Sequence, residues 1–185
     1  LIDAGQWGRA RSLLNHELED HPGDTQNEIL ALMHLQAVDL ADGLGPPSGA
    51  VANRLFELLR TRGVNANTRL AATVLHEGVR VFKGEPFEQA YAYQTIAMQK
   101  GTEADWGNVR AAALASLDLL DEFDAMRDQH TQAHRGDQPR YEYAIQQADF
   151  PLAYLMAAAA NRALGRPDEA RDYARHASDL QPELR

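Results

Sequence analysis

Two histidines with a metal-ligand spacing, His130 and His134, lie four residues apart in the chain. On a helix this spacing places both imidazoles on one face, and Asp128 and Asp137 are nearby carboxylates that could complete a metal site. The surrounding segment is polar, and it runs into the helix-breaking stretch 135–139. We therefore interpret both histidines as solvated side chains at a helix end, and we expect no metal and no cofactor.

The carboxylates that could carry acid–base chemistry are Glu85 and Glu88, on either side of Pro86. Proline fits the first turn of a helix, and acidic side chains there complement the positive end of the helix dipole. We favour this structural role and expect no catalytic residues. One alternative stays open, a small-ligand or enzyme site in a groove around Glu88, Tyr91 and Arg110.

Four arginines concentrate positive charge near the C-terminal end of an acidic chain: Arg162, Arg166, Arg171 and Arg175. They could bind an acidic peptide or a carboxylate. Four acidic residues in the same region could instead pair with them on a solvated helix: Asp168, Glu169, Asp172 and Asp179. We favour the solvated ion pairs, which are common on exposed helix faces.

Composition excludes several classes of function. The net charge of −9 argues against binding to nucleic acid or to an anionic membrane, because both need clustered cations. The chain has no cysteine, which excludes disulfides, thiolate catalysis and cysteine–zinc sites. No stretch approaches the roughly 18 uninterrupted apolar residues of a transmembrane helix, so we expect no direct membrane insertion.

Helical periodicity and helix breakers predict an all-α chain of about eight helices. Alanine and leucine dominate the apolar residues, and β-branched residues are sparse, which favours helix over strand. The predicted helices span 6–20, 25–41, 50–60, 66–83, 86–100, 106–123 with a possible extension to 134, 151–164 and 167–180. Loops are expected at 43–49 and 135–139.

A short segment recurs three times, at 5–11, 104–110 and 165–171. Each copy begins with a turn and continues with a ring residue, a small residue and an arginine that open a helix rich in alanine or leucine. The ring residues are Trp7, Trp106 and Pro167, and we expect the two tryptophans to pack at helix corners. Recurrence at helical corners is typical of an α-solenoid, in which neighbouring repeats bury each other's apolar faces.

The stretch 153–182 resembles a tetratricopeptide repeat (TPR), the helical hairpin of one class of α-solenoid. Its small residues at the packing seam match Ala158, Ala170 and Ala177, and Gly165 falls at the turn between the helices. Helices that cross at short range need small residues where their backbones approach. We therefore expect Ala158 and Ala170 to be buried and to face each other.

The segment 1–22 matches a second half-repeat. Gly5, Ala10 and Pro22 have the same mutual spacing as Gly165, Ala170 and Pro182. The region 25–135 departs from the motif and contains the long loop 43–49. The resemblance implies a single domain over 1–185, a right-handed α-solenoid of about four helical hairpins with an irregular middle. It also implies a non-catalytic scaffold that binds a protein or peptide, as part of a larger bacterial protein or assembly.

A second resemblance rests on the segments 83–88 and 105–110, followed by the helix 150–164. In this order they are similar to bacterial TPR-like envelope lipoproteins of unknown function. The similarity implies export to the periplasm or anchoring at the outer membrane; without it, a cytoplasmic protein is expected. Since Leu1 directly precedes a repeat corner, we expect the chain to be a processed product or a piece of a longer protein.

The faces that remain after the alanine and leucine seams are used should line a concave groove. On one inner helix these residues are Tyr91, Gln94 and Met98, and on the other they are Leu155, Ala159 and Arg162. Tyrosine and arginine are common anchors at protein interfaces, so Tyr91 and Arg162 are the expected contacts with a partner.

Overall fold

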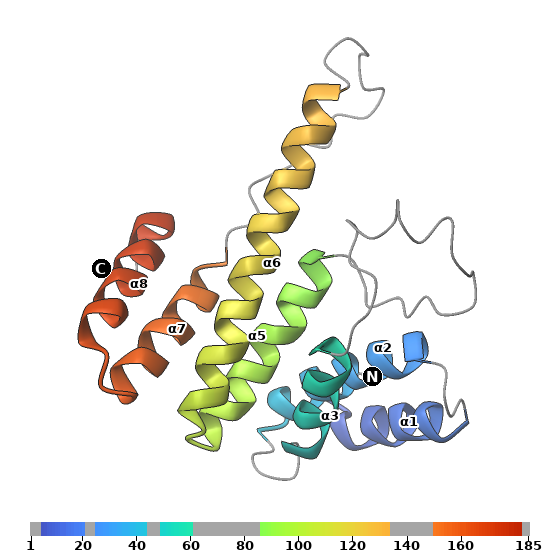
Figure 1. Cartoon of the computed structure of the whole chain (residues 1–185). Coiled ribbons are helices and arrows are strands. Elements are labelled where there is room, and N and C mark those ends of the chain that lie inside the picture. The colour runs from blue at the N-terminus through green and yellow to red at the C-terminus, as the bar shows by residue number, and fades with distance from the viewer. Residues whose placement is uncertain (1–4, 21–24, 44–48, 61–85, 134–149, 183–185) are drawn as a thin grey trace. The chain divides into compact units, whose positions relative to one another are not determined.

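In a computed structural model the described residues are 5–20, 25–43, 49–60, 86–133 and 150–182, without the side chains of 25, 26 and 124–133. Within them every regular element is helical (Figure 1), which confirms the all-α prediction. The helices, labelled as in Figure 1, are α1 (Trp7–Asp20), α2 (Thr25–Ala41), α3 (Gly49–Arg60), α5 (Pro86–Thr102), α6 (Trp106–Ala133), α7 (Pro151–Ala163) and α8 (Pro167–Leu180). The helix predicted over 66–83 lies outside the described residues.

The chain divides into two units. Unit 1 comprises residues 1–84 and 95–105, and unit 2 comprises residues 85–94 and 106–185. The helix α5 therefore contributes its first half to unit 2 and its second half to unit 1. Each unit is described by itself below.

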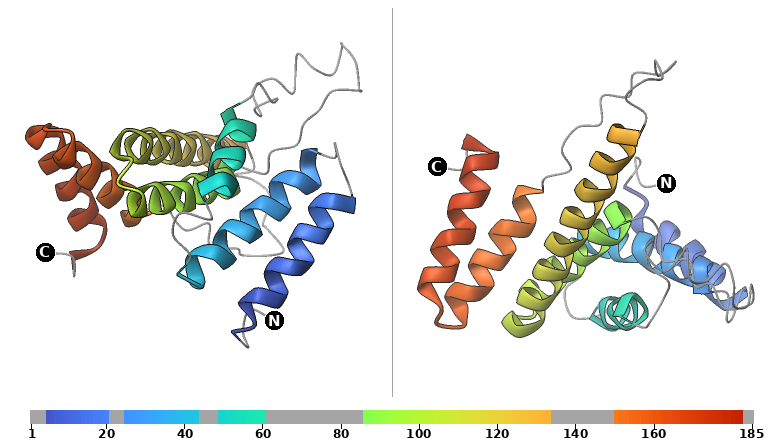
Figure 2. Two further views of the ribbon diagram at one scale, coloured as in Figure 1. Left: turned by 90° about the horizontal axis from the view of Figure 1, so that it is seen from below. Right: turned by 45° about the horizontal axis from the view of Figure 1, so that its top comes forward.

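In unit 1, α2 packs against both α1 and α3, and Figure 2 shows α1 and α2 side by side. The apolar residues Ile29, Leu32, Leu35 and Val38 of α2 are buried. Two leucines of this unit have the spacing of core residues but are exposed: Leu13 of α1 at 54% and Leu30 of α2 at 51%. Among the residues of α1, only Ala10 is buried, so the face that this helix buries against α2 is narrow.

Ion pairs between helices add to the packing of unit 1. Arg11 of α1 donates from Nε to Asp39 and from a terminal nitrogen to Asp42, both on α2 and both at 2.8 Å. The hydrogen bonds to Asp42 and Asp39 raise the pKa of Arg11 further above its usual value. In the same way, Arg54 of α3 binds Glu28 of α2 at 2.7 Å.

A polar cluster lies at the end of α5 within unit 1. The buried ammonium of Lys100 donates to Glu103 Oε2 at 2.8 Å, and Gln99 Nε2 donates to Glu103 Oε1 at 3.2 Å. This carboxylate lies against the first residue of α3: a Cβ added at Gly49 would lie 2.5 Å from Glu103 Oε1. A side chain at the beginning of α3 would therefore displace the Glu103 carboxylate from its present position.

In unit 2, α7 packs against α6 on one side and against α8 on the other (Figure 1). Alanines at positions 153, 157 and 160 of α7 have no exposed surface, which lets neighbouring helices approach closely. Arg110 Nε of α6 donates to Asn161 Oδ1 of α7 at 2.9 Å. The first half of α5 joins the unit through a buried hydrogen bond from Ser116 Oγ to the Ala90 carbonyl at 2.9 Å.

The three recurring segments share a backbone conformation. Each begins with a residue in the left-handed region: Gly5 has a φ of 64°, Ala104 of 57° and Gly165 of 74°. Two residues later a helix begins with Trp7, Trp106 or Pro167. The prediction that this segment marks a turn before a helix is confirmed at all three positions.

Two of these turns also share their hydrogen bonds. After α7, the Gly165 N–H donates to the Arg162 carbonyl at 3.2 Å and the Arg166 N–H to the Asn161 carbonyl at 2.8 Å. After α5, the Ala104 N–H donates to the Gly101 carbonyl at 3.1 Å and the Asp105 N–H to the Lys100 carbonyl at 3.0 Å. Both patterns are Schellman motifs, which normally place glycine at the left-handed position. Ala104 is thus an alanine where the geometry favours glycine.

Candidate functional site

A hollow of about 460 Å³ lies on unit 2 between α7 and α8. We call it the α7–α8 hollow. Four alanines, two arginines and a proline line it: Ala158, Ala159, Arg162, Pro167, Ala170, Arg171 and Ala174. The hollow exists because alanine side chains end at Cβ and leave the space between the two helices unfilled.

The alanines of the hollow differ in exposure. Ala158 and Ala170 are only 9% and 8% exposed, so the prediction that both are buried is confirmed, and both line this one hollow. Ala159 is exposed. Opposing alanines of α7 and α8 therefore form the floor, whereas Ala159 lies where a bound molecule could reach it.

The two arginines differ in their partners. Arg171 binds Asp168 at 3.1 Å, three residues away on the exposed surface of α8. The side chain of Arg162, on α7, makes no ion pair with any described residue. Exposed pairs contribute little stability, about 0–1 kcal/mol, so Arg171 can exchange its carboxylate for another. Each wall of the hollow thus carries one available cation.

The other two arginines of the C-terminal cluster are paired as the sequence predicted. Arg175 binds Asp172 at 3.4 Å, and Arg166 lies 3.9 Å from Glu169. These pairs join residues three apart on or just before α8, and all four side chains are largely exposed. Neither arginine belongs to the hollow.

The predicted groove is only partly assembled. Ala159 and Arg162 line the α7–α8 hollow, and Leu155 is half-buried on the same helix. Tyr91 and Met98 are exposed, but Tyr91 belongs to unit 2 and Met98 to unit 1.

Gln94 is wrongly assigned to the groove, because it is 4% exposed. Its Nε2 donates to Ser116 Oγ at 3.4 Å, so the residue lies on the face of α5 that packs against α6. A buried side chain held by this hydrogen bond cannot contact a partner.

The alternative site around Glu88, Tyr91 and Arg110 has one member with a structural role. Arg110 donates to Asn161, whose Nδ2 donates in turn to the Ala157 carbonyl at 2.9 Å. Asn161 is fully buried; its hydrogen bond with Arg110 ties α6 to α7, and its bond to Ala157 lies within α7. If Arg110 turned away from Asn161 to bind a ligand or a substrate, the buried amide oxygen of Asn161 would lose its hydrogen bond.

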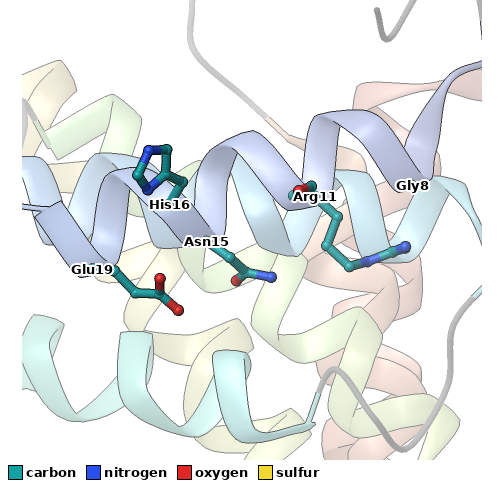
Figure 3. Close-up of a pocket in the computed structure, with 6 residues that line it drawn as sticks. Gly8, Arg11, Asn15, His16 and Glu19 are labelled. Carbon is teal, nitrogen blue, oxygen red and sulfur yellow. The ribbon is translucent and has the colours of Figure 1, made fainter.

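A second hollow, of about 450 Å³, lies along α1 in unit 1. Figure 3 shows Arg11, Asn15 and Glu19 projecting from the same side of this helix. Arg11 is already bound to Asp39 and Asp42, and His16 lies 3.5 Å from Asp20. The residues that line this hollow come from one helix, so groups from different elements do not converge there as they do in a catalytic site.

Sequence reasoning predicted Ala159 and Arg162 as contacts with a partner, and it considered Arg171 as a cation for an acidic peptide but favoured an ion pair on the helix surface for it. It missed Ala174. The signal in the sequence was the run of alanines at 157–160 together with Ala170 and Ala174. Side chains this small cannot fill the space between two facing helices. His134 lies outside the described residues, and the side chain of His130 is not described either. Within the described part of the chain, no group of three or more metal-binding side chains occurs.

The described helices include none that is both long and apolar enough to cross a membrane. No protein-family model, curated protein or solved structure matches this chain. Its function must therefore be inferred from its own residues, among which the α7–α8 hollow combines apolar surface with available positive charge.

Proposed function

We propose that this chain is a non-catalytic, TPR-like scaffold, a right-handed α-solenoid that holds a segment of another protein. The recurring turn supports this proposal, because a residue in the left-handed conformation precedes each of α1, α6 and α8 by two positions. Repetition of one corner at several helix junctions is typical of stacked helical hairpins.

The observation that carries the proposal is the α7–α8 hollow. Its floor is alanine, and its walls carry Arg162 and Arg171. Interfaces between proteins commonly combine an apolar centre with a polar rim. The exposed position of Ala159 leaves this apolar surface open to a partner.

A protein segment fits the hollow better than a small molecule does. Small-ligand sites are concave and bury about 70–90% of the ligand surface among large apolar and aromatic side chains. Here the lining consists of alanines, proline and two arginines on neighbouring helices. A trough of this kind suits an elongated occupant that lies along the helices.

Site-specific photo-crosslinking tests the proposal. Benzoylphenylalanine would replace Ala159 in the hollow and, as a control, Asp118, which is exposed on α6 of the same unit. In an extract of the native cells we expect position 159 to form one dominant protein adduct that position 118 does not form. Identical adducts at both positions, or none at position 159, would contradict a binding role for the hollow.

A further inference from the structure

We infer that the α7–α8 hollow binds an α-helix with carboxylates along both edges of a small apolar stripe. This inference rests on the proposed scaffold function and specifies the chemistry of its partner. Three observations carry it: the two alanine faces of α7, the unequal covering of these faces, and the cations on the walls.

The first alanine face of α7 shows what such a surface accepts. Ala153, Ala157 and Ala160 are fully buried and lie on the side of α7 that includes Asn161. Asn161 accepts the hydrogen bond from Arg110 of α6, so this is the side on which α6 packs. Here a stripe of alanines binds a helix, and a hydrogen bond between an arginine and an oxygen holds it in place.

The second alanine face of α7 is only partly covered by α8, because Ala158 is buried whereas Ala159 is exposed. Ala158, Ala159 and Arg162 follow each other at helical spacing and line the α7–α8 hollow together with α8. On this side the small side chains meet α8 but leave an open hollow above the contact. Because two helices with small facing residues form a groove into which a third helix can pack, the expected occupant is helical.

The charges on the walls select the chemistry of that helix. Arg162 on α7 makes no ion pair with a described residue, although the chain carries a net charge of −9. Arg171 on α8 has only an exposed carboxylate three residues away. Since guanidinium groups bind carboxylates through two parallel hydrogen bonds, Glu or Asp on each edge of the occupant would complete both walls.

The part of α8 that lines the hollow sets how much of the occupant is bound. These residues run from Pro167 to Ala174, so about two turns of a partner helix, at a rise of about 1.5 Å per residue, lie along the hollow. Within about two turns, a short stripe of alanine and leucine and a carboxylate on each side can be presented.

The test uses two labelled synthetic peptides with the intact chain. Both peptides are capped helix formers with an alanine–leucine stripe, and the stripe is flanked by glutamates in one and by lysines in the other. Fluorescence anisotropy gives the Kd of each. We expect the glutamate peptide to bind at least about tenfold more tightly than the lysine peptide, with affinity that falls as salt rises.

Two charge reversals locate the binding. Arg162→Glu removes a cation from the hollow, whereas Arg175→Glu makes the same change on an exposed arginine outside it. We expect Arg162→Glu to weaken binding by about tenfold or more, and Arg175→Glu to change it by less than about threefold. Circular dichroism of both variants confirms that helix content is unchanged.

Several results would overturn the inference. Equal binding of the two peptides, or equal loss in the two variants, would show that the hollow does not select carboxylates. Self-association of the chain that Arg162→Glu abolishes would assign the hollow to a second copy instead. If the photo-crosslink at position 159 forms while the glutamate peptide fails to bind, the scaffold proposal stands and only the acidic-helix inference is rejected.

Discussion

Two of the left-handed turns can be tested by opposite substitutions, alanine to glycine in one turn and glycine to alanine in the other. Ala104 and Gly165 hold the same position in two Schellman motifs, with φ values of 57° and 74°. Alanine in this conformation costs about 1–2 kcal/mol, whereas glycine adopts it freely. Ala104→Gly should therefore stabilise the protein, and Gly165→Ala should destabilise it.

The surroundings of both residues isolate this backbone effect. Ala104 is exposed, so its methyl group contributes little packing, and a Cβ added at Gly165 would meet no atom within 4 Å. The greater freedom of glycine in the unfolded chain offsets roughly 0.4–1 kcal/mol of the conformational gain. The net change in the free energy of unfolding is then about 0.5–1 kcal/mol in each direction.

Urea unfolding followed by circular dichroism measures the effect. With a slope of about 1–3 kcal/mol per molar urea, the midpoint should rise by roughly 0.2–1 M for Ala104→Gly and fall by a similar amount for Gly165→Ala. At position 165, asparagine should be tolerated better than alanine, and valine should be tolerated least. A lower midpoint for Ala104→Gly, or an unchanged midpoint for Gly165→Ala, would refute the assignment of these turns.

Three further substitutions test the packing. Gly49→Ala should destabilise unit 1 by about 0.5–1.5 kcal/mol in urea unfolding, because its Cβ would displace the Glu103 carboxylate that accepts hydrogen bonds from Lys100 and Gln99; an unchanged midpoint would place that carboxylate elsewhere. Arg11→Ala should cost about 1–3 kcal/mol, because it leaves the buried Asp39 unpaired. Because the pKa of Arg11 is raised in the folded protein, its ion pairs stabilise the fold throughout the neutral and mildly alkaline range. This stabilisation is lost only as the pH rises through that pKa. If the effect of Arg11→Ala on stability disappeared near neutral pH, the ion pairs would be contradicted. Ala157→Leu should overpack a fully buried position and lower the free energy of unfolding by about 1–3 kcal/mol, which would appear as a lower melting temperature. An unchanged melting temperature would contradict the close packing of alanines on α7.

The bounds of the helices follow from local signals, which explains why the sequence predicts them well. Proline at 86, 151 and 167 begins α5, α7 and α8, where the first turn has no use for its missing N–H. Gly165 ends the preceding helix because it adopts the left-handed conformation. These preferences act within a few residues and need no knowledge of the rest of the molecule.

The choice of buried face depends on neighbours that a local pattern cannot reveal. Leu13 and Leu30 have the periodicity of core residues, yet both are exposed. Gln94 has the polarity of a surface residue, yet it is buried because Ser116, 22 residues later, accepts its hydrogen bond. The α7–α8 hollow arises from the way two helices face each other, so the sequence predicts Ala159 and Arg162 as contacts without predicting the trough between them.

Chemical-shift mapping tests the central claim, that the α7–α8 hollow is a binding surface for an acidic helix. The glutamate peptide would be titrated into ¹⁵N-labelled chain while the backbone amide resonances are followed. We predict that the largest shifts occur at Ala159, Arg162 and Ala174 in the hollow, with no change along α1 in unit 1. Shifts that are absent from α7 and α8, or that are as large along α1 as in the hollow, would contradict the claim.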